Sequence, residues 1–347
     1  MPTDKPKAIV IHDAKDLRIE TAQPSEPEAG EVLIDLAVGG ICGSDLHYYN
    51  HGGFGTIRLR EPMVLGHEVS GRVKSLGHGV DGLSVGDLVA VSPSRPCGQC
   101  RYCREGLHNH CEAMRFYGSA MPFPHIQGAF RQSLTALASQ CVTANGLTDG
   151  EAAMAEPLAV CLHGAKRAGD LMGKRVLITG AGPIGNLCLL VAKAAGAVET
   201  VVTDLSDEAL GYAQKIGASD TINMAEQPDG LSQYAKGKGT FDVLFECSGA
   251  APALVGAIPA MRPRSVIMQL GLGGDMTLPV QAMTAKEIDL RGSFRFHEEF
   301  ETAVRLMQNG TIDVRPLISH RMALEDAKEA FELASNRKAA MKVQLAF

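Results

Sequence analysis

Residues 174–270 alternate between short apolar runs and helical patterns, and this alternation limits the possible folds more than any other feature of the chain. The apolar runs have the length of buried strands. They lie at 174–179, 199–204, 241–246 and 265–270, and helical patterns follow the first two at 186–195 and 207–216. Strands that alternate with helices predict the α/β class, with a doubly wound parallel sheet.

A glycine-rich turn, Gly180-Ala-Gly182-Pro183-Ile184-Gly185, joins the first strand to the first helix. In such a turn the first glycine permits the tight bend, and the second lets the backbone approach a pyrophosphate. The third glycine packs the helix against the strand, and the helix N-terminus faces the anion. A glycine turn that binds nothing is the alternative. The flanking strand and helix favour a dinucleotide site.

Asp204 ends the second strand, 19 residues after Gly185. At this position a carboxylate accepts hydrogen bonds from the ribose hydroxyls of the cofactor. The following residues, Leu205-Ser-Asp-Glu208, include no Arg or Lys that would hold a 2′-phosphate. NAD is therefore favoured over NADP.

The regions on either side of this pattern differ from it. About the first 150 residues are rich in Gly and Pro and carry short alternating runs, such as 32–38 and 88–91, which are typical of a β-rich domain. The last 50 or so residues contain helical patterns at 299–309 and 324–334 and a closing strand at 342–345. A chain of 347 residues has room for two domains.

Four cysteines, Cys97, Cys100, Cys103 and Cys111, occur at spacings of two, two and seven intervening residues. Four thiolates can bind one tetrahedral zinc ion and leave no open position, so they predict a structural zinc site. Ordinary buried cysteines and an iron–sulfur cluster are the alternatives. The ferredoxin pattern requires an earlier fourth cysteine followed by proline, and here Glu112 follows.

A second group of potential metal ligands comprises Cys42, His67-Glu68 and Glu156. Each of them alone is compatible with an ordinary core, turn or helix-start residue. A catalytic zinc has about three protein ligands and one open position, which beside a nucleotide site would take an alcohol oxygen. Ser44 could then begin a proton relay that His47 or a water chain continues.

The order of Gly66-His67-Glu68, the four cysteines, the glycine turn and Asp204 resembles that of the zinc-dependent medium-chain dehydrogenases, over essentially the whole chain. Three further motifs resemble the sorbitol and polyol dehydrogenase branch. They are Cys42-Gly-Ser-Asp-Leu-His-Tyr, Ala155-Glu156-Pro-Leu-Ala-Val and Gly292-Ser-Phe-Arg295-Phe. The branch signal is Glu156, because ethanol-type alcohol dehydrogenases carry a cysteine there.

This resemblance implies a GroES-like β-rich catalytic domain over 1–155 that carries the zinc lobe, residues 95–112 around the four cysteines, and a Rossmann NAD-binding domain over 156–295. Residues 296–347 would return to the first domain. The resemblance also implies two zinc ions per chain, and members of the branch commonly form dimers or tetramers. It leaves open whether Glu68 or Glu156 ligates the catalytic zinc directly, with the other acting through water.

The runs 114–125 and 290–296 resemble sugar-acid dehydrogenases of the same branch. They imply hydride transfer between NAD and a secondary alcohol of a sugar acid, with L-idonate and 5-dehydro-D-gluconate as the expected pair. A carboxylate substrate suits an arginine, and Arg295 and then Arg115 are the candidates. The alternatives are a polyol dehydrogenase for sorbitol or xylitol, a threonine dehydrogenase, and a non-enzymatic nucleotide-binding module. The last would be expected to lack catalytic-metal ligands.

Composition excludes several other classes. The net charge is −6 with no long basic run, which argues against a nucleic-acid partner. No apolar stretch approaches the length that spans a bilayer, so no membrane is expected. The N-terminus has no apolar secretion signal, and the nine cysteines are an odd number. Reduced thiols and the cytoplasm are therefore expected.

Overall fold

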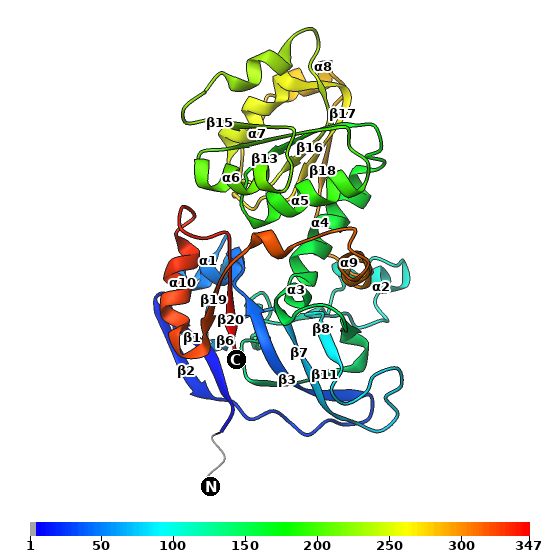
Figure 1. The fold of residues 1–347 in the computed structure, drawn as a ribbon, viewed down its shortest axis with the longest axis vertical. Helices are drawn as coiled ribbons and strands as arrows, with labels where there is room; N and C mark the ends of the chain where they lie inside the picture. The colour runs from blue at the N-terminus through cyan, green and yellow to red at the C-terminus, as the bar shows by residue number, and fades with distance from the viewer. Residues whose placement is uncertain (1–4) are drawn as a thin grey trace.

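The structure, a computed structural model, describes residues 5–347. The expectation that the N-terminus carries no secretion signal includes residues 1–4, which lie outside the described part of the chain. Two domains are stacked along the long axis of the molecule, and each is built on its own β-sheet (Figure 1).

The first domain contains a seven-stranded sheet, which is antiparallel except for one pair of strands. Its order is β12 (Cys141–Thr143), β8 (Leu88–Val91), β7 (Glu68–Leu76), β3 (Glu31–Gly40), β20 (Lys342–Ala346) and β19 (Ile318–Ala323), and β11 (Ser133–Leu137) also pairs with β3. A second sheet joins β1 (Lys7–Asp13) to β2 (Asp16–Thr21) and β6 (Met63–Val64). The last strands of the chain thus lie beside its first ones.

The second domain contains a six-stranded sheet in which every neighbouring pair is parallel. Its order is β15 (Asp220–Asn223), β14 (Glu199–Asp204), β13 (Arg175–Thr179), β16 (Phe241–Glu246), β17 (Met261–Gln269) and β18 (Asp289–Gly292). In chain order this arrangement reads 3-2-1-4-5-6, which is the Rossmann order. The predicted fold class is therefore confirmed.

Two of the helices differ from the sequence prediction in where they begin. Helix α5 starts at Pro183, three residues before the expected start, because proline is well accommodated in the first turn of a helix. Helix α10 (Ala327–Ser335) starts three residues later than expected, since a 3₁₀ turn occupies Leu324–Asp326. The boundaries of the three domain segments stay predictions.

Two helices join the domains. α4 (Ala155–Ala168) runs from the first sheet to the second, and α9 (Glu299–Gln308) packs beside it (Figure 1). One hydrophobic core continues through this region, from Leu88 of the first sheet through Leu158 of α4 to Phe245 of the second sheet. The start of α4 is therefore fixed between the two domains.

The remaining helices and short strands cover the sheets or form turns. They are α1 (Gly43–His51), α2 (Arg101–Arg104), α3 (Asp149–Ala153), α5 (Pro183–Ala194), α6 (Asp207–Lys215), α7 (Ala251–Ala257), α8 (Val280–Ala285), β4 (Gly53–Phe54), β5 (Ile57–Arg58), β9 (Ser94–Arg95) and β10 (Arg115–Phe116).

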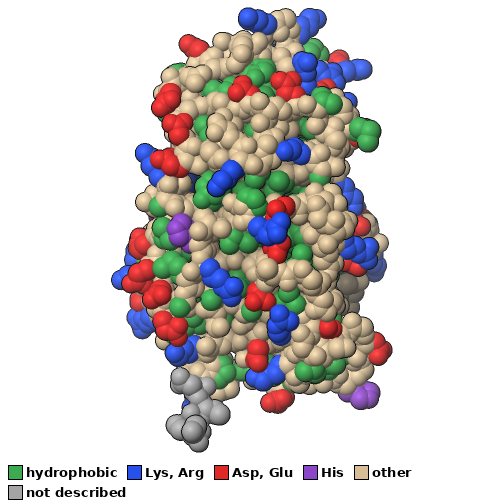
Figure 2. Space-filling model, in the orientation of Figure 1, with side chains coloured by type: hydrophobic (Ala, Val, Ile, Leu, Met, Phe, Trp, Pro, Cys, Tyr) green, Lys and Arg blue, Asp and Glu red, His purple; other side chains and the backbone are tan. Residues whose placement is uncertain are grey.

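Acidic and basic side chains are interspersed over the face of the molecule in Figure 2, with no large area of one sign. No basic stripe crosses this face. Within residues 5–347, no helix combines the length and the apolar character that crossing a membrane demands.

Candidate active site and metal centres

Three potential ligands come together in the first domain beside its junction with the second. Ligand atoms of Cys42, His67 and Glu68 all lie within 4.8 Å of one another. Cys42 caps the N-terminus of α1, His67 lies in the loop before β7, and Glu68 is the first residue of that strand. Thiolate, imidazole and carboxylate are the ligand types that zinc prefers.

Two glycines make this arrangement possible. Gly66 has φ +91°, and a Cβ there would lie 2.0 Å from the Phe130 ring, so only glycine allows the turn that presents His67. Gly40 pairs with Glu68 across β3 and β7, and a Cβ there would lie 2.2 Å from Oε2 of Glu68. The Glu68 carboxylate therefore fills space that a side chain at position 40 would take.

Asp45, which the sequence analysis did not single out, connects two of the ligand segments. It is fully buried, and its carboxylate accepts hydrogen bonds from the backbone N–H groups of Cys42 (3.0 Å) and Gly66 (3.1 Å). Its Oδ1 lies 3.8 Å from Nδ1 of His67. An acidic residue three positions after the helix cap is a capping-box signal, so the sequence did contain evidence for this role.

Lys342 was also missed. Its Nζ donates hydrogen bonds to both carboxylate oxygens of Glu68, at 2.9 and 2.8 Å, and to the carbonyl of Ile41 at 3.2 Å. Lys342 is 3% exposed and lies on β20, 274 residues from Glu68. Nothing in its neighbouring sequence marks it, because only the pairing of β20 with β3 brings it to the site.

Glu156 lies in the first turn of α4, outside the group of three ligands. It is nonetheless close enough to interact with them electrostatically. Burial raises the pKa of Glu156 to about 8, and the charges of Glu68 and Cys42 add to the shift while His67 opposes it. The structure therefore places Glu68 inside the group and Glu156 beside it.

Ser44 and His47 both belong to α1. Burial raises the pKa of the Cys42 thiol to about 12, and a hydrogen bond with Ser44 acts in the opposite direction. The ring centroids of His47 and Phe54 lie 5.6 Å apart. Burial lowers the pKa of His47, and the nearby His51 adds to this shift. Residues three apart share a helix face, so Ser44 and His47 follow one another along α1.

The residues of this group fit a zinc ion. A thiol, an imidazole and a carboxylate converge, and Nδ1 of His67 is buried without a hydrogen-bond partner among the described residues. A buried polar atom without a hydrogen-bond partner is costly. A metal ion bound by the imidazole would offset that cost.

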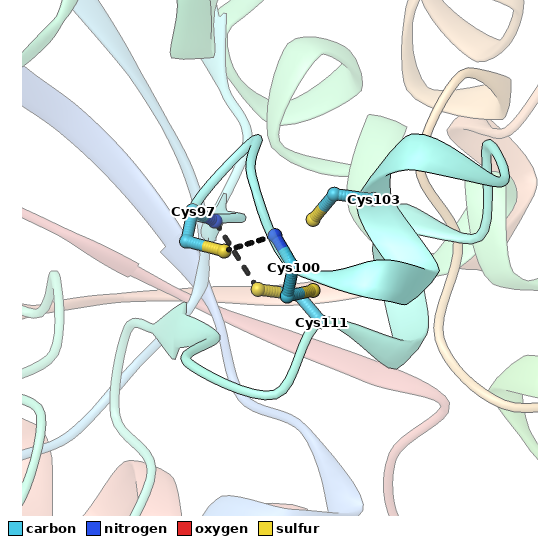
Figure 3. A group of neighbouring side chains, drawn as sticks. All are labelled: Cys97, Cys100, Cys103 and Cys111. Atoms are coloured by element: carbon cyan, nitrogen blue, oxygen red, sulfur yellow. Dashed lines mark hydrogen bonds between the residues drawn. The ribbon is translucent and has the colours of Figure 1, made fainter.

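The four cysteines of the lobe also converge (Figure 3). Their sulfur atoms all lie within 4.8 Å of one another, and Cys103 and Cys111 are buried. The backbone N–H of Cys97 donates a hydrogen bond to the sulfur of Cys111 (3.1 Å), and the backbone N–H of Cys100 donates one to the sulfur of Cys97 (3.4 Å). Backbone hydrogen bonds lower the pKa of Cys100 to about 6, whereas burial raises that of Cys103 to about 12. A closed site of four sulfurs fits structural zinc.

The glycine turn lies at the carboxyl ends of the parallel strands, where this fold binds dinucleotides. Gly180 has φ +90°, and a Cβ there would lie 2.8 Å from the Ser248 nitrogen. A Cβ at Gly185 would lie 1.7 Å from the Gly180 oxygen. At Gly182, the cap of α5, a Cβ would meet open space. The first and third glycines therefore serve packing, and the second leaves room above the helix N-terminus.

Two carboxylates support this edge of the sheet. Asp204 ends β14 and accepts hydrogen bonds from the N–H groups of Ala181 (2.6 Å) and Leu205 (2.7 Å). Glu246, which the sequence analysis did not identify, ends β16 and is fully buried. It accepts a hydrogen bond from the side chain of Gln269 at 2.6 Å, so it joins the ends of two strands.

The two predicted substrate arginines lie in different surroundings. The Arg295 guanidinium lies over the ring of Phe116, at 4.2 Å from its centroid, and over that of Phe294, at 4.9 Å. Burial lowers the pKa of Arg295 to about 10, while the nearby Glu156 and Tyr48 oppose the shift. Arg115 is exposed. Neighbouring strand residues point to opposite faces, and Phe116 faces His67 with 5.7 Å between ring centroids. Arg115 therefore faces away from the site.

Comparison with known proteins agrees with this geometry. Residues 28–146 match the alcohol dehydrogenase GroES-like domain, and residues 183–309 match the zinc-binding dehydrogenase domain. The chain belongs to the zinc-dependent medium-chain alcohol dehydrogenase family. Membership confirms the predicted resemblance, the enzyme class, and zinc and a nicotinamide as the cofactors of the family.

Among its relatives is the L-idonate 5-dehydrogenase (NAD(P)(+)) of Escherichia coli K12, which is 42% identical over 345 residues and covers 99% of each chain. The crystal structure of the E. coli K-12 L-idonate 5-dehydrogenase superposes with a TM-score of 0.95, again over 99% of each chain. The sorbitol dehydrogenase of Gallus gallus is 37% identical over 343 residues and covers 97% of this chain and 95% of its own.

Proposed function

We propose that this chain is a zinc-dependent dehydrogenase that transfers a hydride between NAD and a secondary alcohol of a sugar acid, with L-idonate and 5-dehydro-D-gluconate as the pair. The observation that carries the proposal is the placement of Arg295. The guanidinium lies over two aromatic rings, interacts with Glu156, and one of those rings, Phe116, also faces His67, so Arg295 provides a carboxylate-binding group beside the chemistry. The 42% identical relative supports the same substrate.

In this proposal Cys42, His67 and Glu68 hold the catalytic zinc. When bound, zinc supplies Lewis acidity that favours loss of the proton from a substrate hydroxyl, and the nicotinamide accepts the hydride. Lys342 fixes the Glu68 carboxylate, and Asp45 fixes the loop that carries His67. Glu156 lines the site without being a direct ligand. Of the two carboxylates, Glu68 belongs to the group whose ligand atoms lie within 4.8 Å of one another, and Glu156 does not.

The proton leaves through α1. The Ser44 hydroxyl accepts the proton that the substrate hydroxyl loses and releases its own toward His47, the next residue along the same helix face. Burial lowers the pKa of His47, which favours the neutral form of the ring. Cys97, Cys100, Cys103 and Cys111 hold the second zinc and take no part in the reaction.

The carboxyl ends of the parallel strands would hold the dinucleotide, and Gly182 with the start of α5 would bind its pyrophosphate. Asp204 binds the ribose hydroxyls. The absence of Arg and Lys from 205–208 supports NAD rather than NADP. The cytoplasm is the proposed compartment, in keeping with nine cysteines of which none forms a disulfide. A dimer or tetramer stays a prediction that rests on the resemblance.

A substrate panel tests the proposal. We expect turnover of L-idonate with NAD to exceed that of sorbitol, xylitol and L-threonine, and to exceed turnover with NADP. Arg295→Ala should raise KM for L-idonate about tenfold or more and change KM for sorbitol less than twofold, because loss of a charged hydrogen bond penalises only the carboxylate. Arg115→Ala is the matched control and should change neither. Equal losses on both substrates with Arg295→Ala would exclude the carboxylate role.

Polyol dehydrogenase is the second candidate, because the sorbitol dehydrogenase of Gallus gallus is 37% identical to the chain. In that case sorbitol or xylitol would be the better substrate in the same panel, and Arg295→Ala would affect them at least as strongly as L-idonate. No turnover of any panel member would contradict both candidates.

A further inference from the structure

We propose that the four-cysteine lobe positions Arg295, with Asn109 as the main positioning residue and His108 as its support. The lobe would thereby contribute to recognition of the substrate carboxylate as well as to stability. This inference rests on the proposed function, in which Arg295 binds that carboxylate.

Arg295 has a backbone conformation that needs support. Its φ is +54°, in the left-handed region that residues other than glycine seldom adopt. Such a conformation persists only when the surrounding structure holds it in place. Arg295 lies between β18 and α9 in a segment without helix or strand, so regular secondary structure does not provide that support.

Three consecutive residues of the lobe, His108, Asn109 and His110, contact this segment, although Asn109 and Phe294 are 185 residues apart in the sequence. The side-chain amide of Asn109 donates a hydrogen bond to the backbone carbonyl of Phe294, at 2.9 Å. The ring of His108 stacks on that of His297, with 4.1 Å between centroids. The ring of His110 lies 5.9 Å from that of Phe294. These contacts fall on both sides of Arg295.

The Asn109 hydrogen bond is the most specific of these contacts. Asn109 is 7% exposed and belongs to the 3₁₀ turn His108–His110, which ends directly before Cys111. Two of the four sulfurs, those of Cys103 and Cys111, therefore flank the positioning residues in the sequence. The carbonyl that Asn109 holds belongs to Phe294, whose ring is one of the two aromatic faces on the Arg295 guanidinium.

The other aromatic face comes from the same part of the first domain. Phe116 lies on β10, which pairs with β9 just before the first cysteine of the lobe. The lobe and its two flanking strands thus fix one ring directly and the other through the backbone. A displacement of the lobe would move both faces of the guanidinium and change its direction relative to the candidate ligands.

Asn109→Ala tests the inference in the zinc-loaded enzyme. It should raise KM for L-idonate about five- to tenfold, the effect of one lost hydrogen bond, and leave KM for sorbitol and both kcat values within twofold. Zinc content should stay at two ions per chain. Arg104→Ala is the matched control. Arg104 is an exposed residue of the same lobe, and among the described residues it has no contact with the segment that carries Arg295. Equal changes on both substrates, or none, would overturn the positioning role.

A second pair of variants covers the case in which Asn109→Ala loses zinc or fails to fold. His108→Ala removes the stacked ring, and His108→Phe retains one. We expect the alanine variant to raise KM for L-idonate selectively and the phenylalanine variant to restore it. Failure of the phenylalanine variant to improve on the alanine variant would contradict the inference.

Hydrogen exchange separates this inference from the proposed function. In Asn109→Ala, backbone amides of residues 293–297 should exchange faster than in the unmodified enzyme, whatever the substrate. If Arg295→Ala proves unselective, the carboxylate role fails, and faster exchange would still support the positioning of this segment by the lobe. Unchanged exchange would overturn it.

Discussion

At the scale of single residues, the candidate site depends on charges that are buried and paired. Lys342 and Glu68 are 3% and 1% exposed, and they form two hydrogen bonds with each other. A buried ion pair adds little net stability compared with apolar residues, but removal of one partner leaves the other charge without compensation. The pair therefore orients the carboxylate more than it stabilises the fold.

Lys342→Met should destabilise the metal-free protein by about 3–5 kcal/mol, because without zinc Glu68 would stay buried as an unpaired charge. Urea unfolding gives the free energy, and zinc content shows whether the candidate catalytic site still fills. Combining Lys342→Met with Glu68→Gln should recover part of the loss. A single variant as stable as the unmodified chain would contradict this reading of the pair.

Residue types with metal chemistry could be predicted from the sequence, whereas their supporting partners mostly could not. Cys42, His67 and Glu68 were candidates because their side chains are typical zinc ligands. Lys342 carried no such signal, since a lysine in a short apolar strand is common and its partner is 274 residues away. Which of the two carboxylates lies in the group with Cys42 and His67 likewise depends on strand pairing, and local sequence does not specify that pairing.

At the scale of the elements, the turn between β13 and α5 separates packing from ligand binding. Gly185→Ala should lower Tm by several degrees or prevent folding, because its Cβ would lie 1.7 Å from the Gly180 oxygen. Gly182→Ala should leave Tm nearly unchanged, since its Cβ meets open space and its φ of −68° suits alanine. The methyl group should nonetheless weaken NADH binding at least tenfold, as measured by fluorescence titration. Normal NADH affinity in this variant would place the pyrophosphate elsewhere.

The contact between α4 and α9 should depend on pH through Glu299. Burial opposes ionisation of this carboxyl, but hydrogen bonds from His163 and from the His297 backbone outweigh it and hold its pKa at about 2. Since the folded pKa lies below the ordinary value of 4.5, the stabilisation is present above about pH 4.5 and is lost as pH falls toward 2.

Glu299→Gln should therefore be less stable than the unmodified protein at pH 7, and its free energy of unfolding should fall less steeply between pH 5 and pH 2. Chemical denaturation across this range measures both quantities. Parallel curves for the two proteins would assign the acid sensitivity to other carboxylates.

Elements with a clear pattern were predicted well, and those defined by tertiary pairing were not. The strands at 199–204 and 241–246 match the observed β14 and β16 because buried parallel strands are continuous apolar runs. The edge strand β18 was missed. Its residues, Asp289–Gly292, are mostly exposed, and only its pairing with β17 defines it.

At the scale of the whole molecule, the two candidate zinc sites should be separable. Metal analysis should find two zinc ions per chain. Cys103→Ser should lower Tm and zinc content first, because the lobe loses a ligand of its closed site. Cys42→Ser should reduce kcat by at least a thousandfold in a protein that still unfolds cooperatively. Activity close to normal with one zinc per chain would contradict the two-site assignment.

The position of β19 and β20 has a consequence for how the chain is made. The first sheet receives these strands only after the entire parallel domain has left the ribosome, since β18 precedes them in the sequence. The parallel domain is a continuous stretch and is free to fold while synthesis proceeds. The sheet that carries Glu68 must wait, with the Lys342 side of its site open. During synthesis, the cofactor platform is thus available before the chemical centre is complete, and the emerging chain would hold dinucleotide before it gains activity.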